Sequence, residues 1–270
     1  MSWSAPTSAA GTAPVALVTG ASAGTGQALS LALAAAGYAV AVLARREAAL
    51  AELVDAIGAG GGRGLALVCD VGDPDAVSGA LDRFLDWSGG RIDVLVNAAG
   101  QPGPVAVPIG EVPLAEFERL WTVNLRAPFL FMSRLLPVMY RQGCGRVVNI
   151  GGNHAMRGRA GRSPYSASKW GLRGLTRTAA LEAGSHGVTV NFVAPGPIAI
   201  ERMKRNWRDR AEREGRTEAA VLADYMRDMG AALGRPSEAE DVVATVMFLL
   251  GPGGRNITGQ DLVVDGGIIV

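Results

Sequence analysis

Short runs of apolar residues recur along the chain, separated by longer segments in which apolar residues follow a helical spacing. The apolar runs predict strands at 15–19, 38–43, 65–69, 92–96, 146–151, 188–193 and 261–264. The segments between them predict helices at 27–36, 46–57, 73–87, 114–119, 121–142, 163–184 and 238–250. Strands that are apolar throughout are typical of a parallel sheet buried on both faces, with right-handed crossovers. The pattern therefore predicts an α/β fold, a doubly wound Rossmann-like domain with a mostly parallel sheet and helices on both faces.

The chain shows no internal repeat and no Pro- or Ser-rich linker after its first residues. We therefore predict a single domain over residues 14–270. Residues 1–13 are rich in Ser, Ala and Thr, and we expect them to form a flexible tail. Residues 200–232 are polar, rich in arginine, and lie between a predicted strand and a predicted helix. Doubly wound folds place such segments over the ligand, so we expect a helical insertion that covers the substrate.

Composition narrows the possible partners and the compartment. The 270 residues carry 26 Lys and Arg against 25 Asp and Glu, which gives no reason to expect nucleic acid or an acidic membrane as partner. No apolar run approaches the roughly 18 residues that span a bilayer, and the first residues do not resemble a signal peptide. The two cysteines, Cys69 and Cys144, are too few for a disulfide framework. We expect a cytoplasmic protein with reduced thiols, no metal site and a small molecule as its partner.

Tyr165 and Lys169 are the first residues that indicate chemistry. If Ser163 and Pro164 open a helix, the pair lies on one helical face, because it is four residues apart. An ammonium group within about 4–6 Å of a phenol favours the phenolate and lowers the tyrosine pKa from its usual value of about 10. Such a tyrosine can give or take a proton while an alcohol and a carbonyl interconvert. On spacing alone, a surface Tyr/Lys pair is the more common case, so the interpretation depends on the residues upstream.

A glycine-rich loop containing Gly20, Gly24 and Gly26 follows the first predicted strand and opens the first predicted helix. Glycines there let the backbone turn sharply and approach a pyrophosphate, which binds the N–H groups of the helix start. The first gap is wider than in the G-x-G-x-x-G fingerprint, and a lone glycine cluster could be a plain tight turn. Its place between strand and helix, together with the Tyr/Lys pair, favours a dinucleotide site.

These motifs and several others, in the same order, resemble those of the short-chain dehydrogenase/reductase family. The matching segments are 19–26, 69–71, 96–100, 123–125, 165–169, 195–197 and 257–267. The resemblance covers the chain from Val15 to Gly267. It implies a seven-stranded sheet, a nicotinamide cofactor and oxidoreductase activity. It also implies a homotetramer or homodimer that packs through the two long helices ahead of and within the active site.

The resemblance also assigns residues to the cofactor. In this family the first loop holds the cofactor phosphates, Asp70 faces the adenine, and the segment 97–100 lines the adenosine ribose. The residues so placed are Gly20, Ser22, Gly24, Thr25, Gly26, Arg45, Arg46, Asp70, Val71, Asn97, Ala98, Gly100, Tyr165, Lys169, Pro195, Gly196 and Ile198. One position departs from the family, because Ile200 stands where a Thr hydroxyl commonly meets the nicotinamide carboxamide. We expect the backbone at Ile198 to hold that group.

The residues after the second predicted strand indicate the form of the cofactor. Family members that prefer NAD carry an acidic residue at this strand end, where it binds the ribose 2′-hydroxyl. This chain has Ala44 there, followed by Arg45 and Arg46. A carboxylate would repel a 2′-phosphate, whereas a guanidinium binds it with paired hydrogen bonds. We therefore predict NADP(H) in preference to NAD(H); the alternative is that the two arginines only solvate a helix start.

The family's catalytic group is Asn, Ser, Tyr and Lys, and this chain lacks the Ser. Asn124 matches the Asn, which holds a helix kink and a water chain. Tyr165 matches the acid/base, and Lys169 matches the lysine that lowers the tyrosine pKa and holds the nicotinamide ribose. The Ser normally stands thirteen residues before the Tyr, and that position is Gly152. The absent hydroxyl would have donated to the substrate oxygen, and loss of one such donor typically costs about 10²–10³-fold in rate.

Three interpretations of Gly152 remain open. Asn153 or His154 supplies a substitute donor, and His154 is the sharper candidate because imidazole can donate and transfer protons near neutral pH. Alternatively, a substrate hydroxyl or a water fills the gap. In the third interpretation the fold has moved from carbonyl reduction to a lyase, isomerase or cyclase reaction, or to a dinucleotide-binding regulator. The intact Asn, Tyr and Lys favour the oxidoreductase.

Arginines gather in the segments expected to face the substrate. Arg157 and Arg162 lie between the fifth predicted strand and Tyr165, and further arginines follow Ile200. Guanidinium groups suit a carboxylate, sulfonate or phosphate. We therefore place Arg157 and Arg162, together with Gly152, at a substrate with an anionic group. The alternative is an ordinary charged helix face, because acidic residues are interleaved after Ile200.

Overall fold

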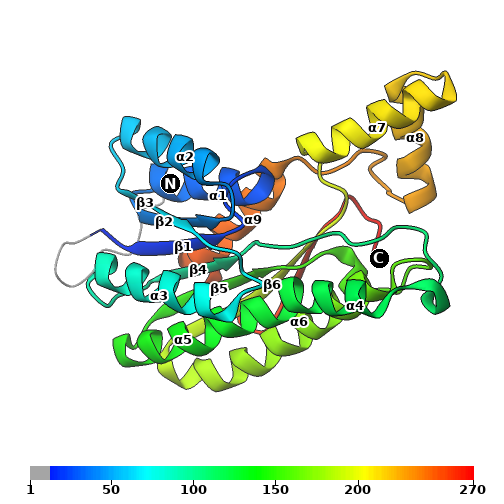
Figure 1. Cartoon of the computed structure of the whole chain (residues 1–270). Helices are drawn as coiled ribbons and strands as arrows, with labels where there is room; N and C mark the ends of the chain where they lie inside the picture. Colours follow the sequence, from blue (N-terminus) through cyan, green and yellow to red (C-terminus); the bar gives the residue numbers. More distant parts are fainter. Residues whose placement is uncertain (1–12) are drawn as a thin grey trace.

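The computed structural model describes residues 13–270 and shows one seven-stranded sheet between two layers of helices (Figure 1). The strands are β1 (Val15–Thr19), β2 (Ala39–Ala44), β3 (Gly64–Val68), β4 (Val94–Asn97), β5 (Gly145–Ile150), β6 (Val188–Pro195) and β7 (Asp261–Val264). Their order across the sheet is β3-β2-β1-β4-β5-β6-β7, and every neighbouring pair is parallel. This confirms the predicted doubly wound α/β fold. Residues 1–12, most of the predicted tail, lie outside the described residues.

The helices form two layers. One face of the sheet carries α1 (Gly24–Ala35), α2 (Glu47–Ala59) and α9 (Ala239–Leu250), and the other carries α3 (Pro74–Ser88), α5 (Ala127–Gln142) and α6 (Ser163–Ala183) (Figure 1). α4 (Leu114–Trp121) packs against α6, while α7 (Glu201–Glu214) and α8 (Glu218–Met229) project beyond the sheet. Within residues 13–270, no helix has both the length and the apolar character needed to cross a membrane.

The side chains of the central strands alternate between two apolar cores. Leu17 of β1 and Leu43 of β2 belong to the core that includes residues of α3, α5 and α6. Their neighbours Val18 and Val42 belong to the core that includes residues of α1, α2 and α9. Because successive side chains of a strand point to opposite faces, a strand between two helical layers is apolar at every position. This explains why continuous apolar runs predicted the strands.

The helix predicted over 121–142 differs from the structure near its start. Residues Thr122–Arg126 form a π-helix between α4 and α5. The wider turn contains Asn124, which is fully buried and bonds to the backbone of Gln101 and to the side chain of Ser168. These contacts join distant parts of the chain, so tertiary structure stabilises the π-helical turn. The spacing of apolar residues therefore does not predict this turn.

The polar block after β6 folds as a pair of helices. α7 ends at Glu214 and is followed by Gly215, whose φ of 61° is the left-handed conformation that favours glycine. α8 follows Thr217, whose hydroxyl accepts a hydrogen bond from the backbone N–H of Ala220. Met229 at the end of α8 packs against Ile268. The helical pair is therefore held against the C-terminal segment.

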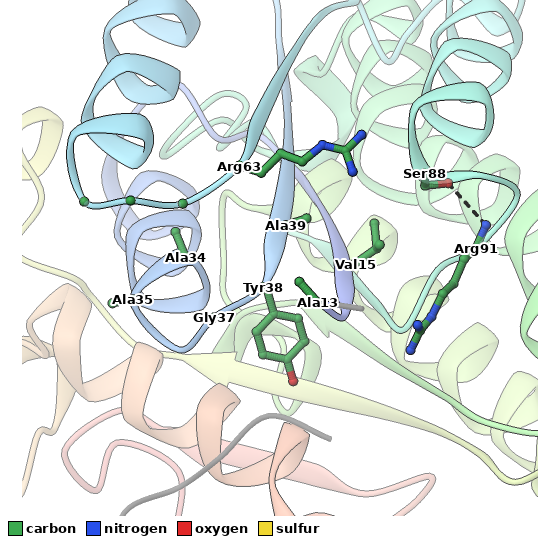
Figure 2. A pocket seen from close by; sticks show the side chains of 13 residues that line it. Ala13, Val15, Ala34, Ala35, Gly37, Tyr38, Ala39, Arg63, Ser88 and Arg91 are labelled. Atoms are coloured by element: carbon green, nitrogen blue, oxygen red, sulfur yellow. Dashed lines mark hydrogen bonds between the residues drawn. The ribbon is translucent and has the colours of Figure 1, made fainter. Parts of the chain in front are cut away.

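The two edges of the sheet carry different hollows. At the amino ends of the strands, Tyr38, Arg63 and Arg91 line a hollow that begins beside Ala13, the first described residue (Figure 2). At the carboxyl ends, the strand order reverses between β1 and β4, so the loops after these strands diverge. Open α/β sheets bind their ligands at such a switch point. The chemistry is therefore expected at the carboxyl edge.

Candidate active site

A cleft of about 470 Å³ lies at the carboxyl ends of the strands. Its wall comes from the loops that follow β1 to β6, from α6 and from the start of α7. The predicted site residues that line it are Gly20, Ser22, Gly24, Thr25, Gly26, Arg45, Arg46, Asp70, Val71, Ala98, Gly100, Tyr165, Lys169 and Ile198. The fold thus brings the glycine loop and the Tyr/Lys pair to one cleft, although they are far apart in the sequence.

The glycine loop fits a negatively charged group. Gly20 and Gly24 have φ angles of 69° and 56°. A Cβ at Gly20 would stand 2.7 Å from the backbone of Ala99, so the loop packs directly against the segment after β4. α1 begins with Ala23 at its N-cap, without a capping side chain and without an acidic residue in its first turn. The first N–H groups of α1 therefore suit a phosphate bound in the cleft.

Arg45 and Arg46 lie at the end of β2, on one wall of this cleft. The Arg46 guanidinium donates to the carbonyl oxygen of Ser22 at 2.7 Å and to the Ser22 hydroxyl at 3.3 Å. Arg45 lies 3.9 Å from the Asp70 carboxylate, and its side chain is 65% exposed. Ala44, at the strand end itself, also lines the cleft. The wall next to Ser22 is therefore predominantly cationic.

Tyr165 and Lys169 lie one turn apart on α6, which has a proline in its first turn. Lys169 is 3% exposed, and its ammonium donates to the carbonyl oxygen of Ile150 at 3.1 Å. The ammonium nitrogen is 5.8 Å from the centre of the Tyr165 ring. Burial lowers the pKa of Lys169 to about 8. Lys169 is thus still mainly protonated at pH 7, but its pKa is much closer to pH 7 than that of a solvated lysine.

Asn124 joins three parts of the site from the π-helix. Its side-chain nitrogen donates to the carbonyl oxygen of Gln101 at 3.0 Å and to the hydroxyl of Ser168 at 3.1 Å. Its side-chain oxygen accepts from the backbone N–H of Gln101 at 2.8 Å. Ser168, the neighbour of Lys169, was not predicted from the sequence. Asn124 therefore holds the segment after β4 against α6, the helix that carries Tyr165.

Three residues that the resemblance places at the cofactor are not part of the cleft wall: Asn97, Pro195 and Gly196. The Asn97 amide donates to the side-chain oxygen of Asn149 at 2.8 Å, and the Asn149 amide donates to the Thr176 hydroxyl at 2.9 Å. This buried chain of polar side chains runs from β4 through β5 to α6. Its geometry fixes the strand ends behind the cleft.

Asn153 and His154, the predicted substitutes for the absent hydroxyl, have different surroundings. Asn153 is 4% exposed, and its side-chain nitrogen donates to the Asp265 carboxylate at 3.4 Å. The His154 ring lies edge-on to the Tyr165 ring, with 5.3 Å between the ring centres and an angle of 82° between the planes. Its Nε2 atom is buried and has no hydrogen-bond partner among the described residues. Burial, assisted by neighbouring arginines, lowers the pKa of His154 to about 4, so the imidazole is neutral at pH 7.

The two arginines predicted at the substrate also differ. Arg157 is exposed and donates to a backbone carbonyl oxygen at the end of α8, at 3.1 Å. Arg162 is 9% exposed and donates to the carbonyl oxygen of Pro104 at 3.0 Å. Neither side chain lines the cleft, and Arg202 at the start of α7 lines it instead. The sequence did not distinguish Arg202 from the other arginines after Ile200, because the path of α7 determines which of them reaches the cleft.

Comparison with known proteins decides the family. The sequence profile described as short chain dehydrogenase matches residues 14–212. This chain belongs to the short chain dehydrogenase family. Such a dehydrogenase is an oxidoreductase, and the family binds a nicotinamide dinucleotide, which agrees with the glycine loop and the cleft described above.

Relatives of this dehydrogenase match it over nearly their full length. The short-chain reductase protein NovJ of Streptomyces niveus is 38% identical over 254 residues, which cover 94% of this chain and 93% of NovJ. A 3-oxoacyl-(acyl-carrier-protein) reductase of Synechocystis sp. is 38% identical over 261 residues, which cover 96% of this chain and 98% of that protein. The solved structure of actinorhodin polyketide ketoreductase with NADPH superposes with a TM-score of 0.85 at 30% identity, covering 95% of this chain and 97% of that one.

Gly152 stands where the resemblance to other short chain dehydrogenases leads us to expect a serine. Its φ of 163° is extended backbone that any residue adopts, so the conformation does not require glycine. A Cβ built at this position would stand 3.0 Å from the Tyr165 hydroxyl oxygen. The small residue therefore leaves room for the phenol to lie close to the end of β5.

The electrostatics of Tyr165 involve arginines that the Tyr/Lys spacing did not indicate. Burial raises the pKa of the Tyr165 phenol, and the charges of Arg162 and Arg202 lower it. The Lys169 ammonium lies 5.8 Å from the ring centre and is bonded to the carbonyl oxygen of Ile150. In this dehydrogenase, arginines therefore contribute positive charge near the phenol.

Proposed function

We propose that this short chain dehydrogenase is an NADP-dependent oxidoreductase that interconverts an alcohol and a ketone or aldehyde. The observation that carries the proposal is that Tyr165 and Lys169 line the same cleft as the glycine loop. When bound, the nicotinamide cofactor supplies or accepts the hydride. Tyr165 gives its hydroxyl proton to the carbonyl oxygen during reduction and takes a proton from the alcohol during oxidation. The glycine loop and the start of α1 would hold the phosphates, and Lys169 would hold the nicotinamide ribose.

We propose His154 as the group that replaces the family's serine. Its ring contacts Tyr165, and its buried Nε2 atom has no partner among the described residues. A buried polar atom without a partner is unfavourable, and a substrate oxygen beside Tyr165 would satisfy it. A neutral imidazole has one N–H to donate. Asn153 is the weaker candidate because its amide is bonded to Asp265.

The cationic wall at the end of β2 supports NADP(H) as the cofactor. Arg46 is fixed against Ser22 by three hydrogen bonds, and the next residue in the chain, Arg45, has an exposed guanidinium. Two guanidinium groups and a hydroxyl can bind a 2′-phosphate through charge-assisted hydrogen bonds. The related polyketide ketoreductase was solved with NADPH and a related xylitol dehydrogenase with NAD+, so the proposed preference rests on the two arginines.

The absorbance of the reduced nicotinamide tests the proposal, measured with NADPH or NADH across a panel of ketones and aldehydes. We expect oxidation of NADPH, with a kcat/KM at least about 10-fold above that for NADH. Arg46→Ala is expected to lower this ratio by about 10-fold, because a hydrogen bond to a charged group contributes about 1.5–3 kcal/mol. Arg134→Ala, which removes an exposed arginine of α5 paired with Asp82, is the matched control.

Two outcomes would contradict the proposal. An equal kcat/KM for NADPH and NADH would remove the cofactor preference. Tight binding of the dinucleotide without oxidation by any carbonyl would favour the alternative, a lyase, isomerase or cyclase, or a dinucleotide-binding regulator. The second outcome is motivated by Gly152, since the family's donor hydroxyl is absent there.

We propose a small-molecule substrate with an anionic group. Arg202 lines the cleft, and no carboxylate among the described residues pairs with it. Its guanidinium suits a carboxylate, sulfonate or phosphate on the substrate. Arg157 is exposed and contacts the end of α8, outside the cleft wall.

We propose that the protein assembles as a homotetramer or homodimer. Large apolar side chains are exposed on α4, α5 and α6: Trp121 at 45%, Phe129 at 50%, Trp170 at 45% and Leu181 at 87%. Exposed aromatic side chains on adjoining helices are typical of a surface that another chain covers. α5 and α6 are the two long helices through which the family resemblance implies assembly.

A further inference from the structure

A buried arginine without a negatively charged partner lies at the start of α6. Arg162 is 9% exposed, and its guanidinium donates to the carbonyl oxygen of Pro104. Among residues 13–270, no Asp or Glu forms an ion pair with it. Holding an unpaired cation away from water is unfavourable. A group that becomes negative during turnover would give this cation its partner.

The Tyr165 ring is the group that the guanidinium covers. The Arg162 Cζ atom lies 4.8 Å from the centre of this ring, within the range of a cation–π contact. When the phenol loses its proton, the ring and its oxygen become negative. The contact then gains a direct Coulombic attraction at short range.

The chain before α6 fixes Arg162 through its backbone as well as its side chain. Gly161 has a φ of 71°, and a Cβ there would stand 2.6 Å from the Cα atom of Ala106. Ala106 itself has a φ of 60°, a conformation that alanine rarely adopts. The segment 104–107 therefore contacts the Arg162 guanidinium at Pro104 and the preceding Gly161 at Ala106, and this close packing restricts where the guanidinium can lie.

The other charged and titratable groups around Tyr165 come from four elements. Lys169 of α6 lies 5.8 Å from the ring centre and is bonded to a backbone carbonyl, so it is farther from the ring than Arg162. His154, in the turn after β5, is neutral at pH 7. Arg202 of α7 adds a second positive charge, and Tyr225 of α8 lies within the field of Arg162.

We propose that Arg162 is a positioning residue that stabilises the phenolate form of Tyr165 and holds its ring against Gly152. The inference rests on the proposed function, because the phenolate forms when the O–H bond of Tyr165 breaks and its proton passes to the substrate oxygen. The phenolate later takes a proton back from water. Electrostatics agree with the geometry, since burial raises the pKa of Tyr165 and Arg162 is the strongest influence that lowers it.

Fluorine NMR of protein labelled with 3-fluorotyrosine tests this role without substrate or cofactor. The chain has 4 tyrosines, and Tyr165→Phe identifies the resonance of Tyr165 by its loss. In Arg162→Gln we expect this resonance to titrate about one pH unit or more above its wild-type midpoint, because an adjacent opposite charge shifts a pKa by about 1–3 units. Arg162→Lys is expected to titrate between the two. Arg134→Gln, far from the cleft on α5, is the matched control with an unchanged midpoint.

An unchanged midpoint in Arg162→Gln would overturn the proposal, and a raised KM with an unchanged midpoint would make Arg162 a substrate-binding group instead. If the Gln variant does not fold, Arg162→Met, which fills the space without a charge, replaces it. The same rise in the titration midpoint of Tyr165 is expected. Where turnover is measurable, the pH profile of alcohol oxidation should move to higher pH by the same amount. The NMR titration remains readable even if no carbonyl is reduced, so failure of the proposed function and failure of this role are separate results.

Discussion

Tyr165→Phe is expected to lower kcat by about 10²–10⁴-fold, the usual contribution of a general acid or base. The substitution removes the hydroxyl that stands beside Gly152 and keeps the ring between His154 and Arg162. The loss should therefore appear in kcat while the dissociation constant for the dinucleotide stays within a few-fold of wild type. Steady-state rates and equilibrium binding of NADPH measure the two quantities separately.

Tyr140→Phe is the matched control for this prediction. Tyr140 stacks on His186 at 4.3 Å between ring centres, outside the residues that line the cleft. We expect this control to retain wild-type kcat. A Tyr165→Phe variant that turns over at the wild-type rate would remove Tyr165 from the reaction. Equal losses in both variants would indicate a general effect of removing a phenol hydroxyl.

Gly26→Ala is expected to weaken dinucleotide binding by at least about 10-fold and to lower the free energy of unfolding by about 1–3 kcal/mol. A Cβ at Gly26 would overlap the carbonyl oxygen of Gly20 and stand 2.8 Å from its carbonyl carbon. Both are backbone atoms of the loop that suits the phosphates, so no side chain can rotate to relieve the overlap. The loop must move, and the N–H groups at the start of α1 move with it. Urea unfolding and a binding titration with NADPH measure the two effects.

Gly79→Ala provides the matched control, since it is also a Gly-to-Ala change within a helix. Gly79 is an exposed residue of α3, and a Cβ there would meet nothing within 4 Å. We expect this variant to be about 0.5–1 kcal/mol more stable than wild type, because alanine is favoured over glycine in a helix. If Gly26→Ala bound NADPH as tightly as Gly79→Ala, the glycine loop would not be the phosphate site.

The strands could be predicted from the sequence because each one is buried between two helical layers. Leu17 and Val18 are adjacent in the sequence and both are fully buried, each in a different core. A strand covered by helices on both faces buries successive residues in this way. The glycine loop was predictable for a related reason, since a turn as tight as that at Gly20 leaves no space for a side chain. Both features depend on neighbouring residues in the chain, so a short stretch of sequence is enough to predict them.

The electrostatics of the site could not be predicted in this way. The Tyr/Lys spacing correctly places both residues on α6, but it does not show that Lys169 is bonded to Ile150 at the end of β5. Nor does it show that Arg162 lies over the Tyr165 ring, because that contact depends on the packing of the segment 104–107. The direction of the Arg162 side chain depends on a segment that is distant in the sequence, so no short motif can predict it.

The π-helix at Asn124 and the separation of Asn153 from His154 have the same origin. Asn124 is held by Gln101 and Ser168, which belong to other elements. Asn153 bonds to Asp265 in the C-terminal segment, whereas His154, the next residue, contacts Tyr165. From the sequence the two residues were comparable donors, and only the folded chain distinguishes their surroundings.

A structure of the enzyme with NADP and a bound ketone or alcohol tests the central claim most directly. We predict that the Tyr165 hydroxyl will lie within about 3 Å of the substrate oxygen, with a ring nitrogen of His154 as the next donor and the phosphates on the glycine loop. A substrate oxygen held by other groups, with the Tyr165 hydroxyl bonded elsewhere, would contradict the account.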